Sequence, residues 1–178
     1  MTPSVLHMLP DLALGGGQIM LLRMVSALRE RGGEHLVCAL RGGPCEADFR
    51  NAGIPILVAG LDGKHRAARA FRRSLKFARQ ARVGIVHTNS TPSDRAFGQM
   101  LALRLGVPVI NTFHGMPPGW IGFPRRLRET PAFLKQKAML LANRLLSRIN
   151  LTHSVAVSAP VAEAYITRIR GFRAINGL

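Results

Sequence analysis

Short apolar segments alternate with amphipathic segments along this chain, and no other feature limits its fold as strongly. Residues 4–9 are mostly apolar and are followed by Pro10, whereas residues 18–31 place Leu21, Val25 and Leu28 on one face of a helix. Apolar strands that alternate with helices favour a parallel sheet covered by helices on both sides. We predict strands at 4–9, 35–40, 54–58, 83–87, 107–113 and 154–157, and helices at 18–31, 44–52, 64–82, 92–105, 131–149 and 159–169.

This alternation predicts one doubly wound domain. Right-handed crossovers between parallel strands give a Rossmann-like α/β fold of three layers, with helices on each side of the sheet. The 178 residues, of which 47% are hydrophobic, suit a single domain that covers residues 1–178 and buries a sizeable core. Residues 115–130 are rich in Gly, Pro and Arg and are predicted to form a long loop.

The chain is strongly basic, with 25 Lys and Arg residues, 9 Asp and Glu residues and a formal net charge of +16. Such a charge favours anionic partners, namely nucleic acid, anionic lipid or phosphorylated metabolites, and a solvated basic surface is the alternative. The basic residues are concentrated in the amphipathic segments 64–82 and 125–148. The second segment, close to Trp120, Ile121 and Phe123, is the better candidate for contact with an anionic membrane.

The N-terminus and the two cysteines favour a cytoplasmic location. The chain begins MTPSVLHMLPD, which lacks the basic and apolar regions of a secretory signal, and no apolar run approaches the ~20 residues that span a bilayer. Cys38 and Cys45 have no metal-ligand partner at a usable spacing, and the acidic residues are scattered, so no metal site is expected. Peripheral attachment to the inner membrane surface is compatible with these features.

A glycine-rich loop precedes the first predicted helix. Gly15, Gly16 and Gly17 lie after the first strand, at the edge where doubly wound sheets bind their ligands, and Gln18 follows them. The first N–H groups of a helix lack partners within the helix, and the dipole makes that end positive, which suits a phosphate or a polar sugar. A turn that only reverses the chain is the alternative. The dinucleotide motif G-x-G-x-x-G fails at Met20, and no P-loop lysine follows.

Polar residues follow two other predicted strands. His114 and Gly115 lie in INTFHGMPPG, and His87, Asn89 and Ser90 lie in VHTNSTPSD. A histidine at a strand end can donate to a substrate oxygen and titrates near neutral pH, and the hydroxyl and amide groups beside it can bind sugar hydroxyls. Either histidine is alternatively a structural residue with satisfied hydrogen bonds.

Five motifs in this order resemble the N-terminal domain of a GT-B glycosyltransferase, specifically of glycosyltransferase family 4. They are a glycine-rich loop before a long helix, a strand ending in His, a strand ending in His-Gly, a strand before a Ser-capped helix, and an Asn-Gly at the domain crossing. In this chain they read GGGQIMLLRMVSALRERG, GIVHTNS, VPVINTFHG, SVAVSAPVAEAYI and AINGL. The resemblance covers essentially the whole chain.

The resemblance implies a role for each matching residue. The catalytic residue His114 would contact the transferred sugar near its reacting carbon. The family usually has Glu where the neutral Gln18 stands. The donor phosphates and sugar would lie against Gly15, Gly16, Gly17 and Gln18; the acceptor side would include His87, Asn89, Ser90, Gly115 and Met116; and the interdomain linker would be Asn176 and Gly177.

The resemblance also implies a reaction. It is the retaining transfer of a sugar from a nucleotide-sugar donor to a glycan or lipid-linked acceptor, without a metal or another cofactor. Family members carry a second domain that binds most of the donor, and this chain stops at Leu178, where that domain would begin. We expect the donor-binding domain to be absent here and supplied in cis or in trans, and the chain alone to be inactive.

Two other functions stay open as alternatives. A basic nucleic-acid-binding α/β module would use the charge of +16, but the sequence lacks zinc spacing, a set of stacking aromatics and an RNA-binding motif, which argues against nucleic acid as a partner. A nucleotide-binding oxidoreductase domain would need the glycine that Met20 replaces.

Overall fold

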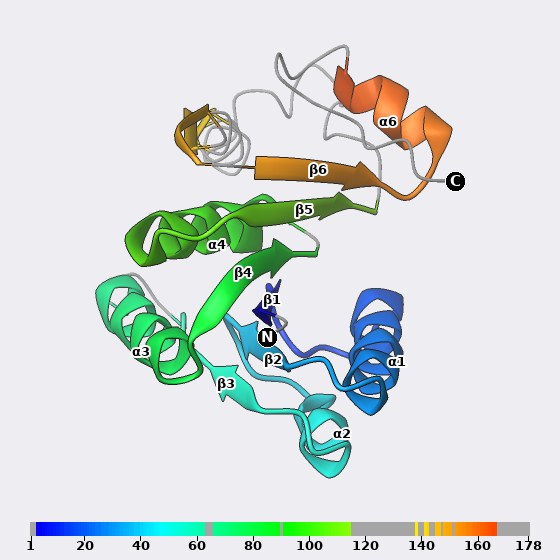
Figure 1. Ribbon diagram of the computed structural model, residues 1–178, viewed down its shortest axis with the longest axis vertical. Helices are drawn as coiled ribbons and strands as arrows, with labels where there is room; N and C mark the ends of the chain where they lie inside the picture. Colours follow the sequence, from blue (N-terminus) through cyan, green and yellow to red (C-terminus); the bar gives the residue numbers. More distant parts are fainter. Residues whose placement is uncertain are drawn as a thin grey trace.

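The computed structural model describes residues 3–62, 66–89, 91–114, 138, 141–142, 145–146, 148–150 and 152–166. These residues form a six-stranded parallel sheet with helices between the strands (Figure 1). The strands are β1 (Ser4–Leu9), β2 (His35–Ala39), β3 (Ile56–Val58), β4 (Val83–Thr88), β5 (Val109–Phe113) and β6 (Thr152–Ala156). The helices are α1 (Gly16–Glu30), α2 (Glu46–Asn51), α3 (Ala67–Gln80), α4 (Pro92–Leu105) and α6 (Ala159–Ile166).

The strand order of the sheet is β3-β2-β1-β4-β5-β6. β1 pairs with both β2 and β4, so the direction in which the chain winds reverses beside β1. This confirms the predicted doubly wound, Rossmann-like fold. Ligands of such sheets bind outside the carboxyl ends of the strands, next to the reversal. The ends of β1, β4 and β5 are therefore the place to look for a functional site.

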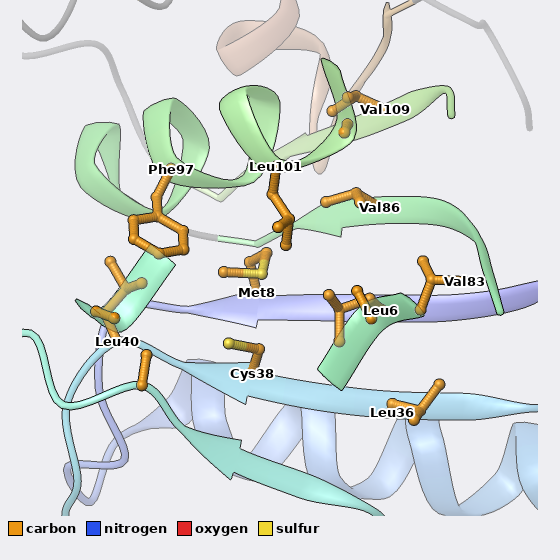
Figure 2. Close-up of a cluster of buried hydrophobic side chains, with 14 residues drawn as sticks. Leu6, Met8, Leu36, Cys38, Leu40, Val83, Val86, Phe97, Leu101 and Val109 are labelled. Atoms are coloured by element: carbon orange, nitrogen blue, oxygen red, sulfur yellow. The ribbon is translucent and has the colours of Figure 1, made fainter. Parts of the chain in front are cut away.

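Helices cover both faces of the sheet, with α1 and α2 on one face and α3 and α4 on the other (Figure 1). On the α3 and α4 side, Leu6, Met8, Cys38 and Leu101 belong to one buried apolar cluster (Figure 2). Phe49 belongs to a second cluster, on the α1 and α2 side. Cys38 is fully buried and acts as a small core residue.

Glycine at position 98 lets α4 approach the sheet closely. A Cβ at Gly98 would lie 2.6 Å from Thr88 Cγ2 and 3.1 Å from Met8 Cγ. Any larger side chain would push the helix away from β1 and β4, the two strands at the reversal.

The element ends agree with the prediction where local signals are strong. α4 has its predicted bounds, because the Thr91 and Asp94 capping box starts it and Gly106, with a φ of 74°, ends it. α1 begins at Gly16, two residues before the predicted start, so its first turn contains glycine. In α3 the buried positions are Ala70, Ser74 and Ala78, whereas Ala68 is exposed.

The C-terminal part of the described chain follows the predicted order. The described residues between 138 and 149 are helical, within the predicted helix 131–149, and the last strand lies at 152–156 rather than 154–157. The predicted loop 115–130 lies outside the described residues. No helix in the described part of the chain is long and apolar enough to cross a membrane.

Candidate functional site

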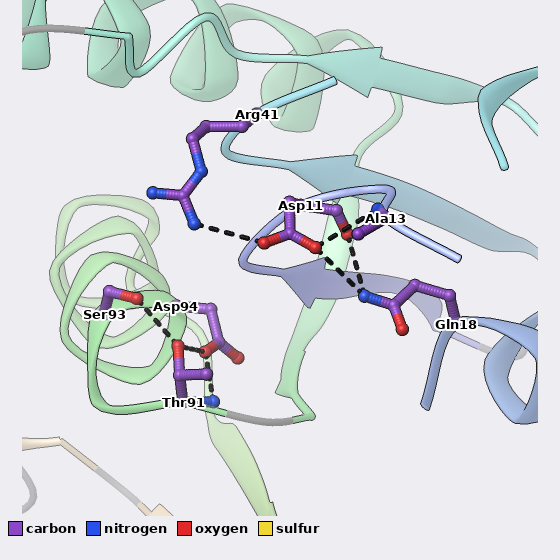
Figure 3. Close-up of polar contacts among 7 residues, drawn as sticks. All are labelled: Asp11, Ala13, Gln18, Arg41, Thr91, Ser93 and Asp94. Carbon is purple, nitrogen blue, oxygen red and sulfur yellow. Dashed lines mark hydrogen bonds and ion pairs between the residues drawn. The ribbon is translucent and has the colours of Figure 1, made fainter. Parts of the chain in front are cut away.

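Asp11, shortly after β1, organises the glycine loop (Figure 3). Its carboxylate accepts hydrogen bonds from the backbone N–H of Ala13 at 3.2 Å and from Gln18 Nε2 at 3.1 Å. It also forms an ion pair with Arg41, whose Nη2 lies 3.1 Å away. One carboxylate thus ties together the ends of β1 and β2 and the first turn of α1. Gln18, predicted to contact the donor, uses its amide nitrogen within the loop.

Gly16 and Gly17 form the first turn of α1 and leave open space beside it. A Cβ at either position would meet nothing within 4 Å, and neither glycine has a positive φ. Contacts within the described chain therefore do not explain why these two positions lack side chains. Bare main chain at a helix N-terminus, with its unpaired N–H groups and positive dipole end, suits close approach by an anionic or polar ligand.

The loop after β2 packs directly on the loop after β1. The backbone N–H of Cys45 donates to the carbonyl oxygen of Leu12 at 3.0 Å. A Cβ at Gly43 would lie 2.3 Å from the Leu12 carbonyl carbon and 2.7 Å from Ala13 N. Only glycine permits this contact between two backbones, which fixes the position of the glycine loop.

The loop after β4 is held by a buried carboxylate. Asp94 Oδ1 accepts hydrogen bonds from the Thr91 backbone N–H at 2.5 Å and from the Thr91 hydroxyl at 2.7 Å (Figure 3). Asp94 Oδ2 accepts one from the Asn89 backbone N–H at 3.2 Å. Burial raises the pKa of Asp94, and the hydrogen bonds from Thr91 oppose that rise. These bonds fix the backbone of the residue that follows β4.

Asn89 has a buried side chain whose hydrogen-bonding groups are unused. It is 4% exposed, and neither its Oδ1 nor its Nδ2 has a hydrogen-bond partner within the described chain. A buried polar group without a partner costs about 1–3 kcal/mol, so native structures rarely contain one without a reason. The Asn89 amide offers a donor and an acceptor at the carboxyl edge of the sheet.

His114 directly follows β5 and is half-buried. Its Nε2 atom is buried and has no hydrogen-bond partner among the described residues. Burial lowers the pKa of His114 below its ordinary value of 6.5, so the ring is neutral at pH 7. Next to it, Arg95 of α4 lies over the Phe113 ring, with its guanidinium carbon 4.5 Å from the ring centroid, and links α4 to the end of β5.

Three histidines from adjacent strands form a hydrogen-bonded row, which we call the histidine row: His35 of β2, His7 of β1 and His87 of β4. His7 Nε2 lies 3.0 Å from His35 Nδ1, and His7 Nδ1 lies 2.9 Å from His87 Nδ1. The row ends at β5, where His87 Nε2 lies 2.7 Å from Thr112 Oγ1. Residues alternate between the faces of a strand, so these rings lie opposite Leu6 and Met8, on the face covered by α1.

The rings of the histidine row are neutral at physiological pH. Burial, reinforced by His87 and then His35, lowers the pKa of His7 to about 2. Burial, followed by the effects of His114 and His35, lowers the pKa of His87 to about 4. The row ends at Thr112, two residues before His114, so it reaches the neighbourhood of the candidate site.

The structure thus brings Gly15, Gly16, Gly17, Asn89 and His114 to one edge of the sheet. It places His87 within the sheet, with both ring nitrogens engaged by His7 and Thr112. Sequence reasoning missed His7, His35 and Thr112, because their contacts depend on the strand order and register of the sheet. Five predicted site residues lie outside the described residues: Ser90, Gly115, Met116, Asn176 and Gly177.

The metal-binding side chains of the described residues do not gather into a metal site. Among them, no group of three or more His, Cys, Asp or Glu side chains is arranged to hold a metal ion. In the histidine row, each ring nitrogen of His7 and His87 already faces another side chain.

The profile of Glycosyltransferase Family 4 matches residues 14–174, which is most of the chain. The chain belongs to glycosyltransferase family 4. This membership confirms the predicted resemblance and favours glycosyl transfer over the nucleic-acid-binding and oxidoreductase alternatives. No curated protein sequence matches the chain significantly.

Solved structures with this fold include GT-B glycosyltransferases. HepE (Alr3699) of Anabaena, in complex with UDP-glucose, has a TM-score of 0.70 and 17% identity, over 98% of this chain and 44% of HepE. MurG of Acinetobacter baumannii has a TM-score of 0.60 and 17% identity, over 89% of this chain and 42% of MurG. The UDP-GlcNAc 2-epimerase of Methanocaldococcus jannaschii has a TM-score of 0.58 and 14% identity, over 92% of this chain and 42% of the epimerase. This chain therefore spans less than half the length of these proteins.

Proposed function

We propose that this chain is the acceptor-side, N-terminal domain of a retaining glycosyltransferase, which moves a sugar from a nucleotide-sugar to a glycan or lipid-linked acceptor. The observation that carries the proposal is the set of unused polar groups at one sheet edge: Asn89 Oδ1 and Nδ2 and His114 Nε2, together with the open first turn of α1. A sugar supplies hydroxyls that both donate and accept hydrogen bonds, which matches these groups. HepE, which shares the fold, has been crystallised with UDP and with UDP-glucose.

The proposed chemistry uses the main chain for the phosphates and His114 for the sugar. A diphosphate leaving group gains negative charge in the transition state, and fixed N–H groups stabilise that charge without reorganisation. Gly16 and Gly17 present such groups at the positive end of α1. Neutral His114 is suited to a hydrogen bond with the transferred sugar, and Asn89 lies on the acceptor side. The proposal assigns no metal and no other cofactor to this reaction.

A second domain completes the proposed enzyme. The chain covers 44% of HepE, and the donor-binding domain would follow the Asn176–Gly177 linker in cis or come from a separate chain in trans. We propose that these 178 residues alone have no significant transferase activity. Robust sugar transfer by the purified chain would refute this part of the proposal.

We also propose peripheral contact with an anionic membrane, which would bring lipid-linked acceptors near the site in the cytoplasm. Leu141, Leu145 and Ile149 are 57%, 49% and 67% exposed and lie at helical spacing on one side of their segment. Exposed Arg148 lies in the same segment. Phe71 and Leu75 of the basic helix α3 pack on the core instead, which leaves the 138–149 segment as the better candidate.

Vesicle co-sedimentation tests the membrane contact. We expect the chain to pellet with vesicles that contain anionic lipid and to stay in solution with zwitterionic vesicles. The triple replacement of Leu141, Leu145 and Ile149 by Ser should reduce pelleting, whereas Leu14→Ser, at a residue 74% exposed just before the glycine loop, should not. Equal pelleting with both vesicle types would contradict the proposal.

The nucleotide-sugar site is tested by titrating the 15N-labelled chain with UDP-glucose, because amide shifts report even millimolar binding. We expect the shifts to be concentrated at Gly16, Gly17 and His114, the residues that the proposal places against the donor. Gly17→Ala should weaken binding about tenfold, roughly 1.4 kcal/mol, because its Cβ would occupy the space beside the helix turn. The same substitution should stabilise the fold by up to about 0.5–1 kcal/mol, since alanine is the better helix former.

Glu30→Ala is the matched control. It also introduces alanine into α1, at the opposite end, and removes a carboxylate from the negative end of the helix dipole. It should stabilise the fold and leave UDP-glucose binding unchanged. If Gly17→Ala and Glu30→Ala bind UDP-glucose equally well, the glycine turn is not part of the proposed site.

A further inference from the structure

The histidine row has only two consistent proton arrangements. A neutral imidazole carries one N–H, and the contact between His7 Nδ1 and His87 Nδ1 needs one proton between its two atoms. One of these rings is therefore protonated on Nδ1 and the other on Nε2. Because both Nε2 atoms also face partners, a change at one contact changes every contact in the row.

The two arrangements differ in direction. In the outward arrangement, His35 donates to His7, His7 donates to His87, and His87 Nε2–H donates to the Thr112 hydroxyl. In the inward arrangement, the Thr112 hydroxyl donates to His87 Nε2, His87 donates to His7, and His7 donates to His35. His87 carries its proton on Nε2 in the first arrangement and on Nδ1 in the second.

The direction of the row decides what Thr112 offers to its surroundings. In the outward arrangement the Thr112 hydroxyl keeps its own proton free to donate to another group. In the inward arrangement that proton is used by His87, and only the lone pairs of the oxygen remain. The half-buried Thr112 lies two residues before His114.

Thr112 also lies at the level of the unused Asn89 amide. Thr88 and Asn111 are register partners in β4 and β5, and the next residues along these strands are Asn89 and Thr112. The hydroxyl at the end of the histidine row therefore belongs to the same sheet edge as the polar groups of Asn89 and His114.

We propose that His35, His7 and His87 act as one positioning device, whose direction sets whether Thr112 donates or accepts a hydrogen bond at the candidate site. The proposal rests on the proposed function, because it takes the ends of β4 and β5 as the place where a sugar or phosphate binds. The depressed pKa values of His7 and His87 fit this device, since both rings stay neutral and the row changes by tautomer rather than by charge.

Ring 15N NMR of the ligand-free 178-residue chain at pH 7.5 tests the row directly, because protonated and unprotonated ring nitrogens have well-separated shifts. We expect His7 and His87 to carry their protons on opposite ring nitrogens. Finding both rings protonated on Nε2, or both on Nδ1, would overturn the proposal.

Variants at the two ends of the row should push it in opposite directions. A buried N–H without an acceptor is avoided more strictly than an acceptor without a donor. Thr112→Val removes the hydrogen-bond partner of His87 Nε2, so His87 should hold its proton on Nδ1. His35→Phe removes the hydrogen-bond partner of His7 Nε2, so His7 should hold its proton on Nδ1 and His87 should hold its proton on Nε2. Identical His87 tautomers in these two variants would overturn the proposal.

Glu34→Gln is the control for His35→Phe, because it changes an exposed neighbour without touching the row. It should leave the His87 tautomer as in the wild-type chain. If the histidines were only structural, His35→Phe in β2 would not move the proton of His87 in β4 from one ring nitrogen to the other.

UDP-glucose titration then connects the row to the site. Thr112→Val should weaken binding about three- to tenfold, the effect of one hydrogen bond, and Thr112→Ser, which keeps the hydroxyl, should bind like the wild type. Equal binding by Thr112→Val and the wild type would overturn the proposed role of Thr112. A wild-type chain that binds no UDP-glucose would count against the proposed donor contacts of Gly16, Gly17 and His114. The His87 tautomers in Thr112→Val and His35→Phe would still show whether the three rings are coupled.

Discussion

Acid should destabilise this fold well above the pH at which its carboxylates titrate, because His7 and His87 are buried as neutral rings. Their pKa values are lowered to about 2 and about 4 in the folded chain, below the value of about 6.5 in an unfolded chain. As pH falls below 6.5, the unfolded chain takes up protons at these rings and the folded chain does not. Their contribution is therefore complete above pH 6.5 and is lost as pH falls, down to about 4 for His87 and to about 2 for His7.

The expected size follows from proton linkage. Each histidine whose folded pKa lies far below the pH removes up to about 1.4 kcal/mol per pH unit below 6.5. From pH 7 to pH 5 this gives about 2 kcal/mol for each ring and about 4 kcal/mol for both. The lowered pKa values of His35 and His114 act in the same direction, whereas the raised pKa of Asp94 opposes them. A loss of about 4 kcal/mol is a large part of the 5–15 kcal/mol typical of a domain.

Urea unfolding curves at intervals between pH 7.5 and pH 5 measure this loss. His7→Phe, which keeps a ring of similar size, should lower stability at every pH but reduce the loss between pH 7 and pH 5 by about half. His153→Phe is the control, because His153 is exposed on β6, and it should keep the full loss. A free energy of unfolding that stays constant from pH 7 to pH 5, or an equal loss in the wild type and His7→Phe, would refute the reasoning.

Three further substitutions test how the site is held. Gly43→Ala should lower stability by about 1–3 kcal/mol in urea unfolding, because its Cβ would lie 2.3 Å from the Leu12 carbonyl and must displace the glycine loop. Asp94→Asn should lower the free energy of unfolding by about 1–3 kcal/mol, because the Asp94 carboxylate accepts hydrogen bonds from the backbone N–H groups of Asn89 and Thr91. It should also shift the amide NMR signals of these two residues, and unchanged signals would contradict this. Leu101→Ala, in the core, should lower stability by about 2–5 kcal/mol, whereas Leu103→Ala, 47% exposed on the same helix, should cost much less.

The fold was predictable because its signals are local and periodic. The run 83–87 is short and mostly apolar, which favours a buried strand, and α3 shows its amphipathic face directly in the sequence. α4 was predicted to the residue because Pro92 and Gly106 mark its ends. The starts of β3 and α3 were misplaced by two and three residues: β3 begins only after Pro55, and no side-chain cap marks the start of α3.

The edge of the sheet was predictable for a different reason. Once the strands are parallel and doubly wound, the residues after β1, β4 and β5 must meet at one edge, so the glycine loop, Asn89 and His114 could be placed together from sequence. The histidine row could not, because it depends on strand order and register. His7 contacts His87 only because β1 and β4 are neighbours and the two residues are register partners 80 positions apart.

Gln18 shows how contacts in the fold explain a departure from the family pattern. The resemblance implies Glu at this position, whereas here Gln18 Nε2 donates to the Asp11 carboxylate at 3.1 Å and to the Asp11 carbonyl oxygen at 3.4 Å. A glutamate at position 18 would set a second carboxylate against Asp11, with no proton to donate at neutral pH. Asp11 meanwhile uses the Arg41 ion pair to join β1 and β2. In this chain the Gln18 amide therefore maintains the shape of the glycine loop through its contacts with Asp11.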